Sequence, residues 1–309
     1  MTPTPSLNRI SRNDMNSPAQ ASEQDSIAQA VIGIKPDANI GKLLEAAGKL
    51  KPQDSDRVVK LQQEQNLRFG EAAKQLGLVT EDDIQQAVAS QFGYPYISPD
   101  EAGLSPELTV ATAPYSKQAE ALRSARSELL LRWFNNGHKT LGVLGARAEE
   151  GASYLAANLA VLFAQMGRKV LLIDANMRQP RQHEMFNLGN GMGLSDILAE
   201  RVPSVQVHTV KPFQTLTVLP AGSPPPNPAE LLARPAFAAL LSGLETSYDI
   251  ILLDTPPSQL SSDFQLIAVR AGGMLIATRR HVSRLVPLTE MKEKITLTGA
   301  QVVGAVLLN

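Results

Sequence analysis

The second half of the chain alternates between two patterns of apolar and polar residues. Six short runs are apolar at almost every position, as strands covered on both faces of a sheet must be; they read TLGVLGA, KVLLIDA, LTVLPAG, DIILLDT, GGMLIAT and AQVVGAVLLN. Around them lie runs typical of helices: SYLAANLAVLFAQMG, GLSDILAE, PAELLARPAFAALLSGLE, SDFQLIAVRA and VPLTEMKEKITLTG. The alternation predicts an α/β fold, with a mostly parallel sheet and helices on both faces.

The first half of the chain carries a repeat instead. Residues 39–62 and 68–91 align at a constant offset of 29 residues. The offset matches Gly41 with Gly70, Gly48 with Gly77 and Gln62 with Gln91. Each unit predicts a short helix, a glycine that ends it and a second helix. Two units are too few for a solenoid, so we expect one small all-helical domain over residues 36–96.

Two segments follow neither pattern. Residues 1–35 are rich in Ser, Pro and Asn and lack the apolar core of a secretion signal, which predicts a disordered tail. Residues 97–117 are punctuated by Pro and Ser, which predicts a linker. Residues 118–309 then make up the α/β domain.

An amphipathic helix, QAEALRSARSELLLRWF, opens that domain. Its Glu120, Arg123 and Arg126 lie at spacings of three and therefore share one helical face. These charges can pair within the helix, or they can meet a neighbouring subunit.

Composition excludes several classes of function. The net charge is −1, so no bulk affinity for nucleic acid is expected. The chain has no cysteine, which rules out disulfides and thiolate metal sites and suits the cytosol. No apolar run approaches the ~18 residues that a membrane span needs.

A phosphate-binding loop is expected where the first strand of the α/β domain meets its helix. The loop reads A-R-A-E-E-G-A-S, whereas a P-loop reads G-x-x-x-x-G-K-[ST]. The nest of backbone N–H groups and the helix N-terminus can remain, because Gly151 and the helix remain. Ala152 stands in place of the lysine, which forfeits a charge-assisted contact of ~1.5–3 kcal/mol.

The charges of this loop further weaken the predicted site. Glu149 and Glu150 bring negative charge toward a polyanion, at a cost of ~1–4 kcal/mol for each charge ~4 Å away. Arg147 or Arg178 can offset part of that repulsion.

Two other predicted strands end in aspartate. VLLIDANMRQP ends its strand at Asp174, with Arg178 four residues on, and DIILLDTPP ends its strand at Asp254. Ligands of parallel sheets bind beyond the carboxyl ends of the strands. Magnesium prefers carboxylates, hydroxyls and waters, and Ser153 offers a hydroxyl in the loop. We therefore expect Ser153, Asp174 and Asp254 to form a magnesium–phosphate site.

Residues 119–309 resemble the bacterial tyrosine autokinases (BY-kinases), a branch of the deviant-Walker P-loop ATPases. LLIDANMRQP resembles their Walker A′ motif, DIILLDTPP their Walker B motif and PPPNPAELL a signature helix start. Together with the helical repeat, EGASYLAANLAVLFAQMGRKVLLIDANMRQPRQHEMF looks most like the exopolysaccharide-operon (EpsG-type) branch. The resemblance implies ATP-dependent tyrosine phosphorylation that controls polysaccharide polymerisation and export.

The resemblance also implies roles for individual residues. It makes Asp174, Arg178 and Asp254 catalytic, with Mg²⁺ on Ser153, Asp174 and Asp254. It assigns ATP binding to Arg147, Glu150, Gly151, Ala152, Ser153 and Tyr154. Glu120, Arg123 and Arg126 match an E-x-x-R-x-x-R oligomerisation motif. The implied partners are a membrane polysaccharide co-polymerase and further copies of the chain, at the cytoplasmic side of the inner membrane.

The chain departs from the family pattern at four points. Ala152 replaces the P-loop lysine, Glu149 replaces a loop glycine, and Asn176 replaces the second Walker A′ acid. No tyrosine cluster follows the last predicted strand, which ends at Asn309. We therefore expect weakened kinase activity.

The repeat resembles the N-terminal domain of type II secretion and pilus ATPases, one branch of which binds cyclic di-GMP. The second unit keeps Arg68, Gly70 and Gln91, and Gln62 lies in the first, but Asn39 replaces the other arginine. An arginine fork binds guanine and phosphate in a way that asparagine cannot copy. Two interpretations stay open: a helical protein-docking domain, and a cyclic di-GMP site at Gln62, Arg68 and Gln91.

Three functions remain open for the whole chain. The first is a tyrosine kinase of an exopolysaccharide system. The second is a catalytically inactive pseudokinase scaffold of the exporter. The third is a partitioning or positioning ATPase, which the E-x-x-R-x-x-R helix and NPAELL disfavour.

Overall fold

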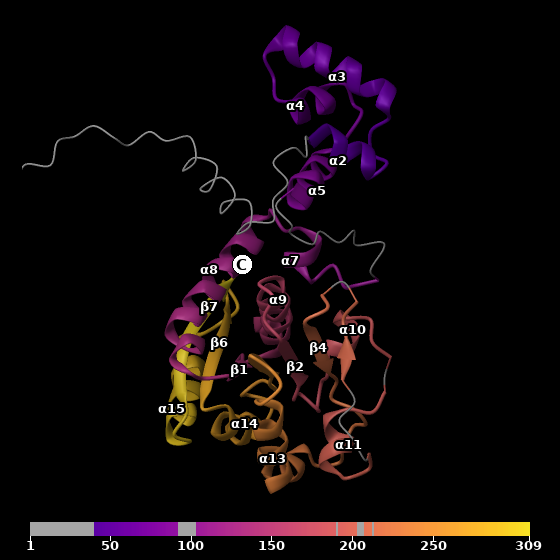
Figure 1. Cartoon of the computed structure of the whole chain (residues 1–309). Coiled ribbons are helices and arrows are strands. Elements are labelled where there is room, and N and C mark those ends of the chain that lie inside the picture. Colours follow the sequence, from indigo (N-terminus) through magenta and orange to yellow (C-terminus); the bar gives the residue numbers. More distant parts are fainter. Residues whose placement is uncertain (1–39, 92–102, 190, 203–206, 212) are drawn as a thin grey trace, which may run out of the picture. The chain divides into compact units, whose positions relative to one another are not determined.

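The computed structural model of the chain divides into two compact units, Met1–Tyr94 and Pro95–Asn309. It describes residues 40–91 and 103–309, apart from residues 190, 203–206 and 212 (Figure 1). The predicted tail, Asn39 and the part of the predicted linker before residue 103 lie outside the described residues.

The described residues of the first unit form helices joined by short turns. They are α2 (Ile40–Ala46), α3 (Pro52–Gln65), α4 (Phe69–Gln75) and α5 (Glu81–Gln91). This order confirms the helix–glycine–helix pattern of both repeats. Gly48 and Gly77 follow the first helix of each repeat with φ of +69° and +66°, a left-handed conformation that costs glycine little.

The helices of the two repeats share a single core. Helix α2 packs against α5, and α3 packs against α4, so each repeat contacts the other. Buried core residues recur at the repeat offset: Leu44 with Ala73, Leu50 with Val79, and Val58 with Ala87. The repeated apolar pattern therefore encodes one shared core.

The second unit is built on a seven-stranded sheet in the order β3-β4-β2-β5-β1-β6-β7. Its strands are β1 (Thr140–Leu144), β2 (Val170–Asp174), β3 (His208–Thr209), β4 (Leu216–Leu219), β5 (Ile250–Asp254), β6 (Gly273–Arg279) and β7 (Gln301–Leu308). Neighbouring strands are parallel except β3 and β4. The mostly parallel α/β sheet is thus confirmed. The two-residue β3 is too short to give a sequence signal.

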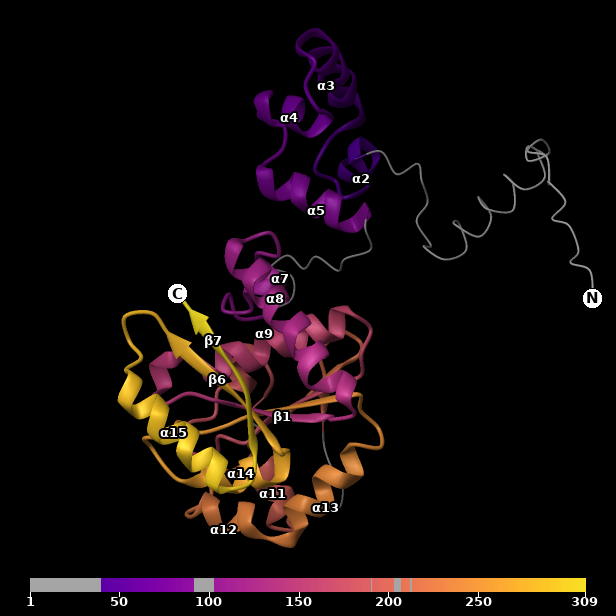
Figure 2. The same cartoon turned by 90° about the vertical axis from the view of Figure 1, so that its left-hand side faces the viewer.

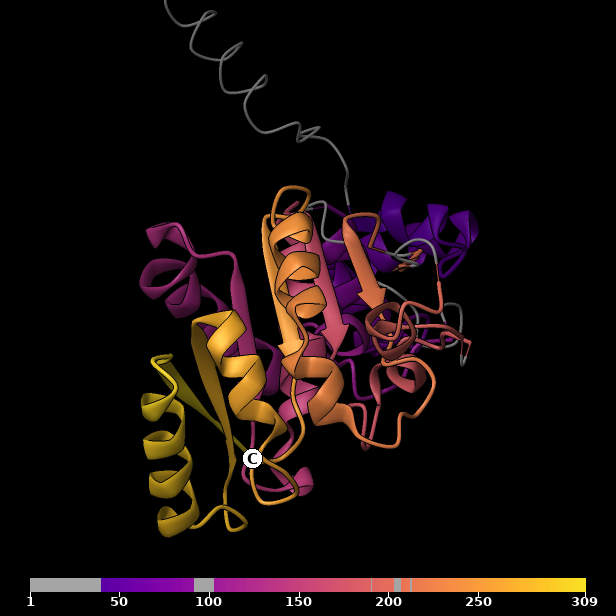
Figure 3. The same cartoon turned by 90° about the horizontal axis from the view of Figure 1, so that it is seen from below.

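Helices cover both faces of this sheet (Figures 2 and 3). One core cluster joins one face to α7 (Thr109–Thr112), α8 (Lys117–Arg132), α9 (Ala152–Gln165) and α10 (Gln182–Met185). The other cluster joins α11 (Leu194–Leu198), α12 (Pro228–Ala233), α13 (Pro235–Leu244), α14 (Asp263–Ala271) and α15 (Leu285–Leu297). Along β2, Val170 and Leu172 enter the first cluster, whereas Leu171 and Ile173 enter the second. Both faces are apolar because both are buried.

One helix prediction is wrong in detail. The run over residues 228–245 forms two helices, because Arg234 is extended (φ −64°, ψ 146°) and Pro235 starts a new helix. Proline disfavours the helical conformation in the residue before it and fits the first turn of a helix.

Part of the range predicted as a linker packs into the second unit. Leu104, Leu108, Val110 and Ala111 are buried in the core cluster, and α7 packs on α9. We call residues 104–112 the covering segment. It lies over the helix that the phosphate-binding loop opens.

Candidate functional site

The loop after β1 leads directly into the N-terminus of α9. A short 3₁₀ turn, Ala148–Glu150, is followed by Gly151, which has φ +82° and gives α9 no side-chain cap. The first N–H groups of a helix lack acceptors within the helix, and its N-terminus carries partial positive charge. This end of α9 can therefore bind an anion.

Glu150 stabilises the loop through hydrogen bonds to the loop's own backbone. Its carboxylate is buried, and Oε2 accepts hydrogen bonds from the backbone N of Ala146 at 2.6 Å and of Arg147 at 3.4 Å. Its Oε1 accepts a bond of 2.8 Å from the Ser283 hydroxyl. The charge of Glu150 is thus directed at the loop's own N–H groups, whereas Glu149 is exposed.

The two predicted strand-end aspartates come together. Asp174 and Asp254 are directly paired in the register of β2 and β5, and both are completely buried. Asp174 accepts hydrogen bonds from three backbone N–H groups of the following loop: Asn176 at 3.2 Å, Arg181 at 3.0 Å and Gln182 at 3.0 Å. Asn176, in place of the second Walker A′ acid, closes a turn with Gln179.

Burial shifts the protonation of both aspartates. Burial raises the pKa of Asp254 to about 6, opposed by hydrogen bonds from Gln182 and Ser153 and by the nearby charge of Arg181. Burial, and then the charge of Asp254, raises the pKa of Asp174 well above its usual value. The pair is therefore short of positive charge.

Gln182 completes this cluster, and the sequence analysis did not identify it. Its Nε2 donates to Asp254 Oδ2 at 2.7 Å and to the carbonyl of Ser153 at 3.2 Å. Its Oε1 and Asp254 Oδ1 are buried without a hydrogen-bond partner. In the sequence, Gln182 is marked only by being a polar residue eight positions after Asp174.

These oxygens suit magnesium. Unpartnered buried oxygens are rare in proteins, and Mg²⁺ binds one or two carboxylates with hydroxyls and waters. The hydroxyl of Ser153 is within hydrogen-bonding reach of Asp254. Among the described residues, no group of three or more His, Cys, Asp or Glu side chains could hold a metal ion, so an ion here would depend on carboxylates together with hydroxyl and water oxygens.

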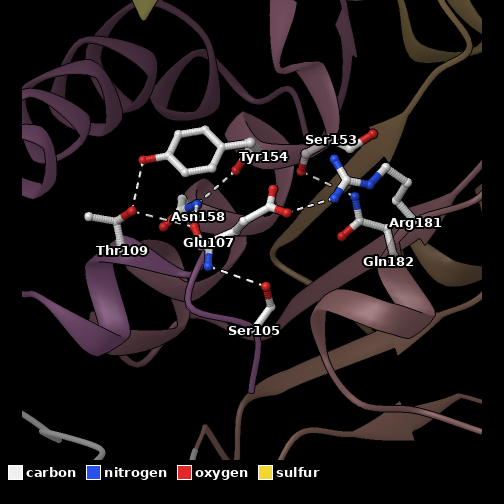
Figure 4. Close-up of polar contacts among 8 residues, drawn as sticks. All are labelled: Ser105, Glu107, Thr109, Ser153, Tyr154, Asn158, Arg181 and Gln182. Carbon is white, nitrogen blue, oxygen red and sulfur yellow. Dashed lines mark hydrogen bonds and ion pairs between the residues drawn. The ribbon is translucent and has the colours of Figure 1, made fainter. Parts of the chain in front are cut away.

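The two arginines predicted to face phosphate have other partners. Arg178 makes a bidentate pair with the buried Asp263, at 2.7 and 3.2 Å. Arg147 Nε donates to the side chain of Gln259 at 3.0 Å. A third arginine, Arg181, which the sequence analysis did not single out, pairs with Glu107 at 2.7 Å (Figure 4).

Two cavities adjoin the loop. A small one of about 50 Å³ is lined by residues of the loop and of the segment after β2, including Ala152, Ser153, Tyr154 and Arg181. A larger one of about 890 Å³ extends over Glu107, Tyr154 and Arg181 to the end of β7. Its volume falls in the range of sites for molecules of nucleotide size.

The covering segment is tied to α9 beside these cavities (Figure 4). Asn158, fully buried on α9, donates to the carbonyls of Glu107 and Tyr154 at 2.9 Å and accepts from Val110 N at 3.1 Å. The Tyr154 hydroxyl donates to Thr109 Oγ1 at 3.0 Å. Tyr154, predicted at the nucleotide, therefore also fixes the covering segment.

The remaining predicted residues lie on other helices. On α8, Arg123 Nη1 donates to Glu120 at 3.1 Å, and its Nη2 donates to the Pro114 carbonyl. Arg126 lies one turn further along α8. In the first unit Gln62 is partly buried on α3, Arg68 is exposed just before α4, and the Gln91 side chain lies outside the described part.

The chain is similar to bacterial tyrosine-protein kinases, although no family model matches it. CapB of Staphylococcus aureus is 35% identical over 200 residues, which cover 65% of this chain and 88% of CapB. The tyrosine-protein kinase YwqD of Bacillus subtilis is 33% identical over 63% of this chain and 83% of YwqD. The tyrosine-protein kinase wzc of Salmonella typhimurium is 31% identical, but only 28% of its length is matched.

The chain is also similar to solved structures, both in sequence and in fold. The chimerical protein CapA2B2 is 33% identical with a TM-score of 0.62, over 74% of this chain and 98% of that one. The kinase domain of Escherichia coli tyrosine kinase ETK is 28% identical with a TM-score of 0.62, over 65% of this chain and 78% of that one. Within the part of the chain that is described, no helix has the length and apolar character needed to cross a membrane.

Proposed function

Because the chain belongs to the family of bacterial tyrosine-protein kinases, we propose that it transfers phosphate from ATP to tyrosine residues of proteins, with Mg²⁺ as cofactor. The observation that carries this proposal is the buried pair Asp174–Asp254 at the N-terminus of α9, where Asp254 Oδ1 and the neighbouring Gln182 Oε1 have no hydrogen-bond partner. In the transfer, the γ-phosphoryl group passes to the phenolic oxygen, ADP leaves and the phenolic proton is released.

The residues of the site would have separate roles in this transfer. The N–H groups at Ala152 and Ser153 would bind phosphate oxygens, as helix N-termini do. Ser153 and Asp254 would hold Mg²⁺, with Asp174 beside them. The metal would supply positive charge that offsets the charge developing in transfer. Gln182 would hold Asp254 in position through its 2.7 Å hydrogen bond.

The rate is expected to be low. Ala152 brings no charge to the β- and γ-phosphates, and such charge stabilises the transition state more than the ground state. The test is mass spectrometry for phosphotyrosine after incubation with Mg²⁺ and ATP, with Asp254→Ala as the control. A kinase gives phosphotyrosine in the unmodified chain and none in the control. Absence of phosphotyrosine in both, including on added partner proteins, contradicts the proposal.

A pseudokinase scaffold is the second candidate. Two observations favour it: Ala152 at the lysine position, and the Glu150 carboxylate on the loop's N–H groups. In that case the chain would bind its partners equally well with Asp254→Ala and without nucleotide.

The proposed setting is an exopolysaccharide system. The chain would act in the cytoplasm, at the inner membrane, by binding the cytoplasmic segment of a membrane polysaccharide co-polymerase. It would assemble with further copies of itself through Glu120, Arg123 and Arg126. The first unit would serve as a docking domain, with cyclic di-GMP binding at Gln62, Arg68 and Gln91 as the alternative.

A further inference from the structure

We infer that Arg181 is the phosphate-binding cation of this chain in place of the missing loop lysine, and that Glu107 is its counter-ion when no nucleotide is bound. The inference rests on the proposed nucleotide site. It concerns Arg181 and Glu107, to which the sequence motifs assign no role.

The backbone fixes Arg181 beside the site. Its backbone N–H donates to Asp174 Oδ2 at 3.0 Å, which places Arg181 at the carboxyl end of β2. Its side chain lines the small cavity together with Ala152 and Ser153, and it also lines the larger cavity. A cation thus stands where Ala152 supplies none.

The other arginines around the loop are less available. Arg178 is paired with Asp263, whose side chain is 2% exposed, and breaking that pair would leave a buried charge unpaired. Arg147 donates to Gln259, and Arg279 donates to the carbonyl of Glu149 at 3.0 Å. Arg147 also lines the small cavity and Arg279 the larger one, but Arg181 lines both and is the one whose backbone N–H is bonded to Asp174.

The partner of Arg181 is easily exchanged. The side chains of Arg181 and Glu107 are 45% and 43% exposed. An exposed pair of this kind changes an equilibrium constant by about fivefold at most. A phosphate group offers the same guanidinium a bidentate, doubly charged partner. Nucleotide should therefore displace the Glu107 carboxylate.

Displacing the carboxylate from Arg181 does not move the backbone of Glu107 away from the site. Its carbonyl is held by Asn158 at 2.9 Å, and the neighbouring Thr109 is held by Tyr154. Figure 4 shows these contacts beside the Arg181–Glu107 pair. A displaced Glu107 would therefore remain close to the phosphates as a like charge. Removing that charge should strengthen binding, whereas removing Arg181 should weaken it.

The experiment is calorimetry of the full chain with ATP and Mg²⁺. Arg181→Ala should weaken binding by about tenfold or more, the loss expected for a charge-assisted contact. Arg181→Lys should recover part of the loss. Glu107→Gln should strengthen binding by about twofold to fivefold. Because the last change acts in the opposite direction, damage to the fold cannot imitate it.

The matched control is Arg132→Ala. Arg132 also pairs with an exposed glutamate at 2.7 Å, Glu128 on the same helix, away from both cavities. It should leave ATP affinity unchanged. ATP affinity should also fall less steeply with salt in Arg181→Ala than in the unmodified chain.

Two results overturn the inference, and they differ. If the unmodified chain binds ATP, Asp254→Ala abolishes binding and Arg181→Ala leaves it unchanged, Arg181 has no such role although the proposed function stands. If the unmodified chain gives no heat with millimolar ATP, the inference and the proposed nucleotide site both fail.

Discussion

Asp174 and Asp254 are paired directly across β2 and β5, and neither side chain is accessible to solvent. Two carboxylates in adjacent, buried positions repel each other, and neither has an arginine or lysine in bidentate contact. The protein holds this arrangement through backbone N–H groups on Asp174 and through Gln182 on Asp254. The site is therefore arranged for a cation that neutralises both acids.

The pair should make the metal-free protein less stable as the pH rises. The folded pKa of Asp254 is about 6, above the usual 3.8, so between these values the folded state binds more protons than the unfolded state. The free energy of unfolding should fall across that window by on the order of 3 kcal/mol from this group. Thermal unfolding in EDTA at pH 4 and pH 7.5 spans this window and measures the loss.

Asp254→Asn is the control for this pH effect. Asparagine can keep the Gln182 bond and removes the repulsion of Asp174. The variant should have a flatter pH profile, unfold at higher temperature at pH 7.5 and gain no stability from Mg²⁺. An identical pH slope in variant and unmodified chain would mean that other groups set it.

Repair of the loop should raise the rate more than the affinity. Ala152→Lys adds positive charge at the β- and γ-phosphates, where it acts mainly on the transition state. Phosphotransfer or ATP hydrolysis should increase by a larger factor than ATP affinity. Adding Glu149→Gly should act mainly on affinity, because it removes repulsion present in both states.

The control for the repair is Asp174→Ala or Asp254→Ala in the repaired background, either of which should erase the gain. A repaired chain that is folded and assembled but still fails to bind ATP or transfer phosphate would identify the site as a relic. The scaffold function would then be favoured.

Loss of Asn158 should destabilise the fold. Its amide bonds two carbonyls and one N–H of the covering segment and α9, all at a buried site. Asn158→Ala leaves the buried Val110 N without its acceptor, although the Glu107 carbonyl keeps the Thr109 N–H, and should cost about 1–3 kcal/mol in urea denaturation. Tyr154→Phe, which removes only the bond to Thr109, should cost about 1 kcal/mol or less. Equal losses in both variants would show that Asn158 does not anchor the segment.

Substitution of both α8 arginines should shift assembly toward monomer. Arg123 pairs with Glu120 within the helix, and both ends of this face remain partly exposed. If the same charges reach a neighbouring subunit, Arg123→Ala with Arg126→Ala should lower the mass measured by light scattering. The prediction is wrong if the unmodified chain is monomeric at all concentrations with its partner's cytoplasmic segment present.

The cyclic di-GMP alternative has its own measurement. Arg68 is exposed at the start of α4, where a planar fork can meet guanine or phosphate. Calorimetry should give modest affinity, which Arg68→Ala abolishes and Arg57→Ala, on the exposed surface of α3, leaves unchanged. No heat with millimolar cyclic di-GMP leaves the docking interpretation.

Sequence periodicity predicted most of the fold. The strands that end at Asp174 and Asp254 could be read from apolar runs followed by an acid. Pro235 divides a run that looks helical throughout, since the local effect of proline outweighs the apolar pattern. The covering segment looked like a linker, because its few apolar residues are interrupted by Pro and Ser and gain their burial only from contact with α9.

The site was predicted less completely. Asp174, Asp254 and Ser153 belong to motifs with fixed positions after a strand or before a helix. Gln182 and Arg181 have no such pattern, because the course of the loop after β2 decides where their side chains point. Glu150 could be recognised as a charge in the loop, but the sequence does not reveal that its carboxylate turns inward onto Ala146 N and Ser283.

The shared core of the first unit makes the folding of one repeat depend on the other. Since α2 packs on α5 and α3 on α4, each repeat buries its apolar residues largely against the other. The two repeats should therefore unfold together in one cooperative transition, and deleting either should leave the other unfolded. One repeat alone would need a second copy of itself to complete this core, so the unit has the architecture of a homodimer joined into one chain.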